Sequence, residues 1–247
     1  MTPPRSLILC TTPRSGSTLV CALIAAAGSG GAPESWYRPE DRADYATDWG
    51  IADAHGGFSA ADYLAAAIRA GSGGDGTFGL RLQPGSLELL RADLASLSWP
   101  APDLALMRRH LGRCRFLHVS RRDGVAQAIS RLKAEVSQVW HLDGSEPAGP
   151  RPRAAYDAAR IDAFRAEAAR GNAAWEAWFA AEGIVPHRLV YEDFAGDPAA
   201  AVVAALDALG LPPQRAGLAV PNRRMADAES AAWAARYRAK RGLPDAL

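Results

Sequence analysis

The segment that decides the fold, Ser6–Leu19, has the sequence SLILCTTPRSGSTL. Its apolar first half predicts a short buried β-strand, and the apolar pattern after Ser17 predicts a helix that ends at Gly28. Backbone N–H groups at a helix start have no partner inside the helix, and the helix dipole favours an anion there. The segment therefore predicts a strand–loop–helix unit whose loop binds a phosphate or sulfate group.

Side chains in this loop add to the backbone donors. Gly16 lets the backbone approach an anion closely, because it has no Cβ. Ser15, Ser17 and Thr18 carry hydroxyl donors. Arg14 carries a planar fork that matches phosphate or sulfate oxygens. These five residues are the first candidates for anion binding.

The loop differs from two well-known phosphate loops. A Walker A loop has a lysine after its last glycine, and here Ser17 follows Gly16, which disfavours a magnesium-dependent NTPase. A protein phosphatase loop needs a wider spacing between cysteine and arginine than the three residues that separate Cys10 from Arg14. An ordinary serine-capped helix after a strand remains the alternative.

Four short apolar or β-branched runs predict strands, at Ser6–Thr11, Thr77–Leu82, Arg115–Ser120 and Arg188–Tyr191. Helical patterns separate them, which is typical of an α/β fold with a mainly parallel central sheet flanked by helices in three layers. We expect one domain over residues 1–247, with Glu34–Gly57 as a long irregular loop. Further helices are expected at 63–70, 87–97, 123–140, 156–183, 198–209 and 229–242.

Composition narrows the class of protein. The chain has 247 residues and a formal net charge of +1, which argues against a general nucleic-acid binder. Cys10, Cys21 and Cys114 have no metal-binding spacing, so we expect reduced thiols and no metal. The apolar run at the start is too short for a signal peptide core, and no run approaches a membrane span. The sequence therefore predicts a cytoplasmic protein.

A second cluster of cations follows the third predicted strand. Arg121 and Arg122 come directly after this strand, and Ser130 lies about two turns into the next predicted helix. Ligands of open α/β sheets bind outside the carboxyl ends of the strands, where the first loop also lies. Either arginine could therefore share an anion with Ser130, in the same crevice as the loop. The alternative is that both arginines are solvated or pair with Asp123.

Together the two clusters resemble the nucleotide-binding pair of sulfotransferases that use 3′-phosphoadenosine-5′-phosphosulfate (PAPS). That pair consists of a TPRSGST loop and an arginine at a strand end, with a serine eight or nine residues later. More narrowly, the chain is similar to the bacterial family typified by trehalose 2-sulfotransferase, and this resemblance implies a P-loop-like three-layer fold. The shared motifs are PRSGSTL, Gly31–Tyr37, FGLRL at Phe78–Leu82, SRRDGVAQAIS at Ser120–Ser130, KAEVSQVWH at Lys133–His141, the W-x-x-W-F helix, LVYEDF at Leu189–Phe194 and RMADAESAAWAARYR.

The resemblance implies a role for each matching residue. The first loop would hold the 5′-phosphosulfate through Arg14, Ser15, Gly16, Ser17 and Thr18. Arg121 and Ser130 would hold the 3′-phosphate. The family arginine aligns better with Arg121, while Arg122 gives the eight-residue spacing of the wider superfamily. Arg223 and Arg224 would close over the nucleotide.

The acceptor hydroxyl needs a general base. The stretch Leu80–Gln83 lacks the histidine that many animal-type sulfotransferases carry there. The resemblance to the bacterial family implies a different base, a glutamate in the loop after the first helix. Alignment with that family places Ser35 at the position of the glutamate and Glu34 one residue earlier. Glu34 is the candidate base and His141 the lesser one, while Arg81 would steady the transferred group.

The acceptor is expected to be a small molecule with a hydroxyl, such as a carbohydrate, a glycolipid or another metabolite. Aromatic side chains stack on sugar or ring faces, although they also anchor loops. The candidate acceptor contacts are Glu34, Trp36, Tyr37, Trp140 and His141. No metal is needed in principle, because arginines, hydroxyls and backbone donors can neutralise the transferred group.

Two alternatives stay open at this point. A P-loop kinase-like phosphotransferase would turn over ATP with magnesium, but the lysine that it needs is absent. A non-catalytic PAPS-binding protein would bind the nucleotide without transfer, and the altered Glu34–Ser35 segment is the reason to consider it. The sequence does not determine the oligomeric state; the resemblance is compatible with a homodimer.

Overall fold

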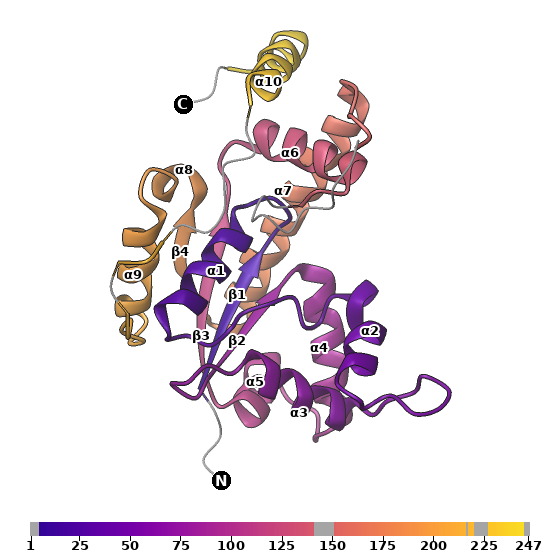
Figure 1. The fold of residues 1–247 in the computed structure, drawn as a ribbon, viewed down its shortest axis with the longest axis vertical. Coiled ribbons are helices and arrows are strands. Elements are labelled where there is room, and N and C mark those ends of the chain that lie inside the picture. Colours follow the sequence, from indigo (N-terminus) through magenta and orange to yellow (C-terminus); the bar gives the residue numbers. More distant parts are fainter. Residues whose placement is uncertain (1–4, 141–150, 216, 220–226, 245–247) are drawn as a thin grey trace.

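A central parallel sheet organises the molecule. The computed structural model describes residues 5–140, 151–215, 217–219 and 227–244. Within these ranges four strands form one sheet in the order β2-β1-β3-β4 (Figure 1), and every pairing is parallel. The bounds are β1 (Arg5–Thr11), β2 (Thr77–Leu82), β3 (Arg113–Ser120) and β4 (His187–Val190). The predicted α/β fold is confirmed, and the strand ends differ from the predicted ones by two residues or fewer.

One face of the sheet is covered by α1 (Ser17–Ala27) and α9 (Pro198–Ala208). Leu7 and Leu9 of β1 belong to this core, and both are fully buried. Strand side chains alternate between the faces, which explains why the intervening residues pack on the other side. Burying a side chain such as Leu206 contributes about 1.5–3 kcal/mol relative to leaving it exposed.

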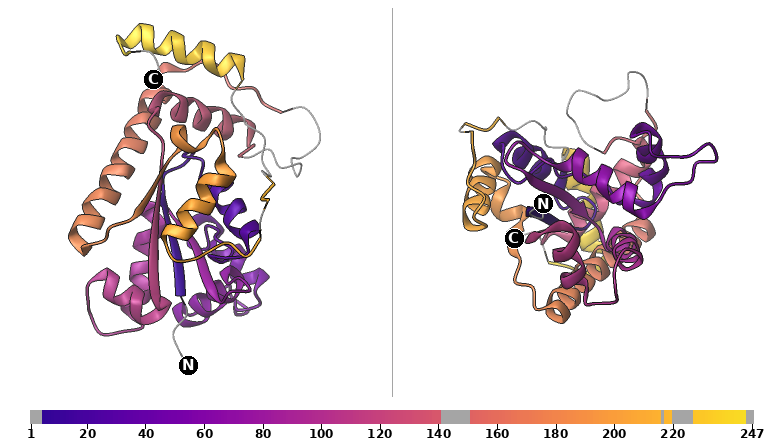
Figure 2. Two further views of the ribbon diagram at one scale, coloured as in Figure 1. Left: turned by 90° about the vertical axis from the view of Figure 1, so that its left-hand side faces the viewer. Right: turned by 90° about the horizontal axis from the view of Figure 1, so that it is seen from below.

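The opposite face packs against α3 (Ala60–Gly71), α4 (Pro84–Ser96), α5 (Asp103–Leu111) and α7 (Ala158–Glu182). This arrangement gives the predicted three layers, seen from two further sides in Figure 2. Trp175, Trp178 and Phe179 of α7 lie in this core. The N–H of the Trp175 indole donates to the carbonyl of Thr11 at 2.9 Å, so α7 is fixed directly to the end of β1.

A third apolar cluster joins α6 (Gly124–Ser137), the first part of α7, and α10 (Ala228–Arg241). Ile161 of α7 and Tyr237 of α10 are fully buried in it. In the left panel of Figure 2, α10 lies across the end of the molecule towards which the strands point. The helices therefore enclose the carboxyl edge of the sheet from above, where the predicted anion-binding residues lie.

One prediction about local structure is wrong, and one helix was not predicted. The segment Glu34–Gly57 is not an irregular loop throughout, because it contains a 3₁₀-helix η1 (Pro39–Asp41) and α2 (Arg42–Asp48). Tyr45 and Trp49, four residues apart, stack at 5.1 Å between ring centroids on one side of α2. The helix α5 was not predicted, although an acidic first turn and a basic last turn are consistent with its dipole.

The cysteines are free, and no disulfide joins them. Cys10 and Cys21 are buried, whereas Cys114 is partly exposed. Burial raises the pKa of the Cys21 thiol to about 12, so this thiol stays protonated at neutral pH. Among the helices within the described ranges, none combines the length and the apolar character that a membrane crossing requires.

Candidate functional site

The loop between β1 and α1 has the geometry of an anion cradle. Gly16 adopts φ +91° at the start of α1, and no side chain caps this helix terminus. The Ser15 hydroxyl is buried and lacks a hydrogen-bond partner among the described residues. Arg14 has φ +63°, a conformation that costs a non-glycine residue about 1–3 kcal/mol and is common at binding sites. Unpaired buried donors around a helix start fit an anionic ligand.

Arg14 joins this loop to α6. Its Nε donates to the hydroxyl of Ser130 at 2.9 Å, and its Nη1 donates to the carbonyl of Trp140. The sequence led us to expect Ser130 beside Arg121 or Arg122, whereas in the structure its hydroxyl accepts from Arg14. Burial, reinforced by the charges of Arg121 and Arg131, lowers the pKa of Arg14 to about 10. Arg14 is therefore still a cation at neutral pH, and it lies in a field of other cations.

Arg121 and Arg122 have different partners. The Arg121 side chain is 13% exposed; its Nε lies 3.5 Å from Glu192 and its guanidinium 4.5 Å from the Tyr191 ring centroid. The Arg122 side chain is 52% exposed and donates to both oxygens of Asp193 at 2.7 and 2.8 Å. These hydrogen bonds raise the pKa of Arg122. Arg121 therefore lies near the Arg14 loop, while Arg122 is engaged at the surface.

The base of the loop is held by a residue that sequence reasoning missed. Gln127 on α6 is 2% exposed, and its Nε2 donates to the hydroxyl of Thr12 at 3.1 Å and to the carbonyl of Pro13 at 2.6 Å. On α7, Gly171 passes so close that an added Cβ would lie 2.9 Å from Thr12. The sequence did carry a signal for this role, because Gln127 is a polar residue on the otherwise apolar face of the predicted helix.

Glu34, Arg81 and Thr18 form a second polar cluster, which links three segments. Arg81 on β2 contacts the Glu34 carboxylate and donates to Ser35 Oγ at 2.8 Å and to Thr18 Oγ1 at 2.9 Å. The backbone is also joined here, because the N–H of Arg81 donates to the carbonyl of Glu34 at 3.0 Å. The structure therefore brings the predicted base Glu34 together with Arg81 and with the first turn of α1.

The aromatic residues predicted to contact an acceptor lie in different environments. Trp36 is half-buried; its ring packs edge-on against Tyr45 at 5.3 Å, and its indole N–H donates to the Gly79 carbonyl at 3.2 Å. Tyr37 is fully buried against Tyr63, and burial raises its pKa. Tyr37 is therefore a core residue, and we no longer assign it to acceptor contact. Trp140 is partly buried beside Arg131, whose guanidinium lies 5.5 Å from its ring centroid.

His141, Arg223 and Arg224 lie outside the described residues. Among the residues that the structure does describe, no cluster of histidine, cysteine or acidic side chains could hold a metal ion.

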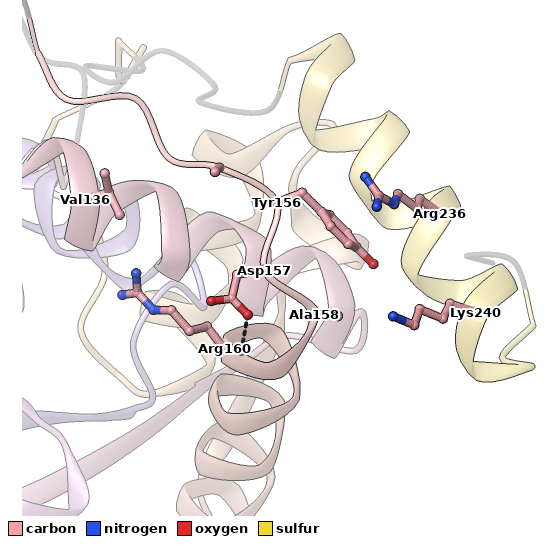
Figure 3. A pocket seen from close by; sticks show the side chains of 8 residues that line it. Val136, Tyr156, Asp157, Ala158, Arg160, Arg236 and Lys240 are labelled. Atoms are coloured by element: carbon pink, nitrogen blue, oxygen red, sulfur yellow. Dashed lines mark hydrogen bonds between the residues drawn. The ribbon is translucent and has the colours of Figure 1, made fainter.

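A separate pocket of about 450 Å³ lies between the end of α6, the start of α7 and α10 (Figure 3). Its lining includes Tyr156, Arg160, Arg236 and Lys240. It contains none of the residues predicted from the sequence to bind a ligand. The Arg14 and Arg121 clusters therefore form a different site, at the carboxyl edge of the sheet.

Comparisons with known proteins bear on this site. The chain is 29% identical, over an alignment of 269 positions, to a trehalose 2-sulfotransferase of Mycobacterium tuberculosis, covering 97% of this chain and 98% of that protein. Among solved structures, the sulfotransferase domain of the Synechococcus PCC 7002 olefin synthase is similar, with a TM-score of 0.46 and 14% identity over 100% of this chain and 91% of that chain. A sequence model of the Stf0 sulphotransferase family matches residues 6–240, so the chain belongs to this family and is a sulfuryl-transferring enzyme.

Proposed function

We propose that this enzyme transfers a sulfuryl group from PAPS to a hydroxyl of a small acceptor. The observation that carries this proposal is the convergence of two cation-bearing turns at one edge of the sheet. Arg14 follows β1, Arg121 follows the neighbouring strand β3, and their charges are close enough to lower the pKa of Arg14. Such a pair suits a nucleotide with an anionic group at each end of its ribose.

Residues of the first loop are proposed to hold the 5′ end of the donor. The buried Ser15 hydroxyl and the uncapped start of α1 at Gly16 offer donors, while Ser17, Thr18 and Arg14 complete the cradle. These groups fit a phosphosulfate, because each can donate to an oxygen and none is acidic. The donor itself supplies the activated sulfuryl group.

Residues of the second cluster are proposed to hold the 3′-phosphate. Arg121 is the preferred arginine, since the Arg122 side chain is turned to Asp193. Ser130 is proposed to contribute its hydroxyl, which accepts from Arg14 of the first loop. Arg224 remains a proposed contact outside the described residues.

Glu34 is proposed to accept the proton of the acceptor hydroxyl. The acceptor oxygen forms a bond to sulfur while the bond between sulfur and the phosphate oxygen breaks. During this step negative charge is spread over the oxygens of the transferred sulfuryl group and the leaving oxygen. Arg81 holds Glu34 and also reaches Thr18 at the donor loop, so it lies where that charge can be neutralised. A positioned base contributes about 10²–10⁴-fold to such a step.

The acceptor is proposed to lie against Trp36 and Trp140, near Glu34. Trp36 follows Glu34 by two residues and belongs to a partly exposed aromatic cluster. An aromatic wall of this kind suits the face of a sugar ring or another ring.

Two measurements test the proposal. First, thermal unfolding is followed with 3′-phosphoadenosine-5′-phosphate, with AMP and with ATP plus magnesium. We expect the bisphosphate to stabilise the chain most, by about 2.7 kcal/mol at 100 times its Kd. Preference for ATP with magnesium would instead favour a phosphotransferase. Second, sulfur-labelled PAPS is incubated with a panel of sugars, glycolipids and phenols, and failure to label any hydroxyl compound would contradict the transfer step.

A further inference from the structure

Tyr191 contacts both clusters of the site, although it belongs to neither the phosphate loop nor the arginine turn. It follows β4, and β4 pairs with β3 but not with β1. Its ring nevertheless reaches the loop that follows β1, because a Cβ added to Gly16 would lie 2.7 Å from Tyr191 Cδ2. The same ring has the guanidinium of Arg121 at 4.5 Å from its centroid. Tyr191 therefore lies between the two cation-bearing turns and contacts both.

The neighbouring residue, Glu192, holds the turn that follows β3, residues 121–123. Its carboxylate accepts the backbone N–H of Arg122 at 2.9 Å and that of Asp123 at 3.2 Å, and it lies 3.5 Å from Arg121 Nε. A carboxylate beside an anion-binding site would repel the ligand if it were not neutralised. Here two backbone N–H donors and the charge of Arg121 face it, so its net effect is to hold the turn and orient Arg121.

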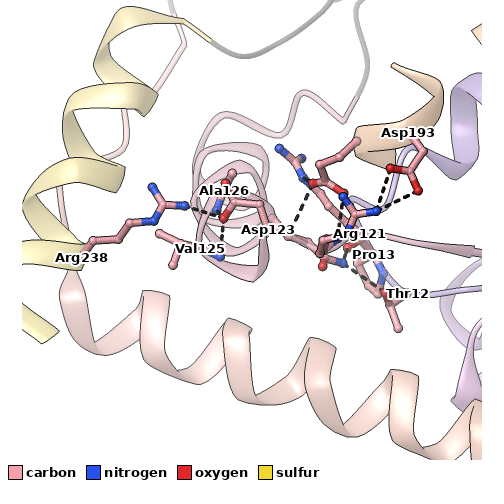
Figure 4. Close-up of polar contacts among 11 residues, drawn as sticks. Thr12, Pro13, Arg121, Asp123, Val125, Ala126, Asp193 and Arg238 are labelled. Carbon is pink, nitrogen blue, oxygen red and sulfur yellow. Dashed lines mark hydrogen bonds and ion pairs between the residues drawn. The ribbon is translucent and has the colours of Figure 1, made fainter. Parts of the chain in front are cut away.

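The turn is also fixed from its far side. Asp123 caps α6 by accepting the N–H groups of Val125 and Ala126, and it pairs with the buried Arg238 of α10 at 2.7 Å (Figure 4). With the turn held by Glu192 and Asp123, the Tyr191 ring is the spacer between Arg121 and the Gly16 loop. A rigid aromatic ring keeps such a separation better than a flexible side chain.

We propose that Tyr191 is a positioning residue that sets the spacing between the two cation-bearing turns, and so makes the enzyme select a nucleotide with two phosphate groups over one with a single phosphate. The inference rests on the proposed function, since it assumes that both clusters bind one nucleotide. Glu192 acts with Tyr191 by holding the Arg121 turn against the ring. Neither residue needs to contact the ligand for this effect.

The test compares the affinities of the full chain for 3′-phosphoadenosine-5′-phosphate and for AMP by calorimetric titration. Replacing Tyr191 with leucine removes the spacer, and we expect the preference for the bisphosphate to fall by about tenfold. AMP affinity should change by less than about threefold, since Gln127 still holds the first loop. Tyr191→Phe keeps the ring and should restore the preference.

A second variant guards against misfolding of the first. Glu192→Gln keeps the side-chain shape but replaces one acceptor oxygen with an N–H₂ group, which faces a backbone N–H or Arg121. We expect it also to lower the preference for the bisphosphate. Asp193→Asn is the matched control, because Asp193 pairs only with the outward Arg122 among the described residues, and it should leave the preference unchanged.

Three outcomes are decisive. An unchanged preference in both Tyr191→Leu and Glu192→Gln overturns the role of this spacer while leaving the proposed function intact. Equal losses of AMP and bisphosphate affinity also overturn it, because they indicate general damage to the fold. A wild-type chain without preference for the bisphosphate overturns the proposed function itself, and with it the inference.

Discussion

The two sides of the site are built in different ways. The donor side, meaning Arg14, Gly16 and Arg121 with their supports, is held by side chains from α6, α7 and α8 (Tyr191–Phe194). The acceptor side, meaning Glu34 and Trp36, rests on Arg81 and on a partly exposed aromatic cluster, and the Glu34 side chain is 43% exposed. The donor side is therefore organised before a ligand arrives, whereas the acceptor side leaves more room for variation.

The largest expected effect lies on the acceptor side, in Glu34→Gln. The amide oxygen of glutamine can still accept a hydrogen bond from Arg81, but the amide cannot act as a base. We therefore expect kcat to fall by about 10²–10⁴-fold. The affinity for 3′-phosphoadenosine-5′-phosphate should be unchanged, because Glu34 is not part of the donor side. Glu40→Gln, in the same segment and exposed, is the control. Normal turnover in Glu34→Gln would show that the base lies elsewhere.

Arg14→Ala should have the largest effect on the donor side. The substitution removes a buried guanidinium and its links to Ser130 and Trp140, so we expect bisphosphate affinity to fall by about 100-fold. Titration of the purified variant measures this loss. Arg69→Ala, an exposed arginine on α3, is the matched control. Unchanged bisphosphate affinity in Arg14→Ala would show that Arg14 does not organise the donor side.

Gly16→Ala should lower the stability of the fold by about 2–3 kcal/mol. The substitution adds the cost of a positive φ to a collision with the Tyr191 ring at 2.7 Å. Gly50→Ala is a sharp control, because Gly50 also has a positive φ but has nothing within 4 Å of an added Cβ. It should cost about 1 kcal/mol by urea unfolding. Equal costs at both positions would mean that the Gly16–Tyr191 contact is easily relaxed.

The smallest expected effect is the difference in bisphosphate affinity between variants of two neighbouring arginines. Arg121→Ala should weaken bisphosphate binding by about tenfold, because it removes one charged contact from the donor side. Arg122→Ala should change the affinity by less than about twofold, since its side chain is exposed and paired with Asp193. Titration at low and moderate salt compares them. The reverse order of effects would assign the nucleotide to Arg122.

Much of the fold was predictable because its signals are local. The strand–loop–helix unit at Ser6–Leu19 and the four strands follow from apolar runs and turn residues that sit next to one another in the chain. The Asp197 cap of α9 is equally local, because its carboxylate accepts the N–H of Ala200, three residues later in the chain. The helix α2 was missed because its stability comes from tertiary packing of Tyr45 and Trp49 onto other aromatics, which no single window of sequence contains.

The site was predictable only in part, for a similar reason. Motifs identified Arg14, Glu34 and Arg81 as candidates, but they did not reveal which side chains touch. The pairing of Arg14 with Ser130 spans 116 positions, and the contact of Arg121 with Tyr191 crosses between strands β3 and β4. Tyr191 and Gln127 act through such distant contacts, so their roles required the structure.

The guanidinium of Arg81 has a consequence for how the two substrates are handled. Its separate nitrogens hold Thr18 of the donor loop, Ser35, and the Glu34 carboxylate. Because the Thr18 oxygen accepts from Arg81, its hydroxyl hydrogen remains available to donate to an anion in the loop. One guanidinium thus spans the proposed donor cradle and the proposed base, so a change at Arg81 would disturb both halves of the reaction at once.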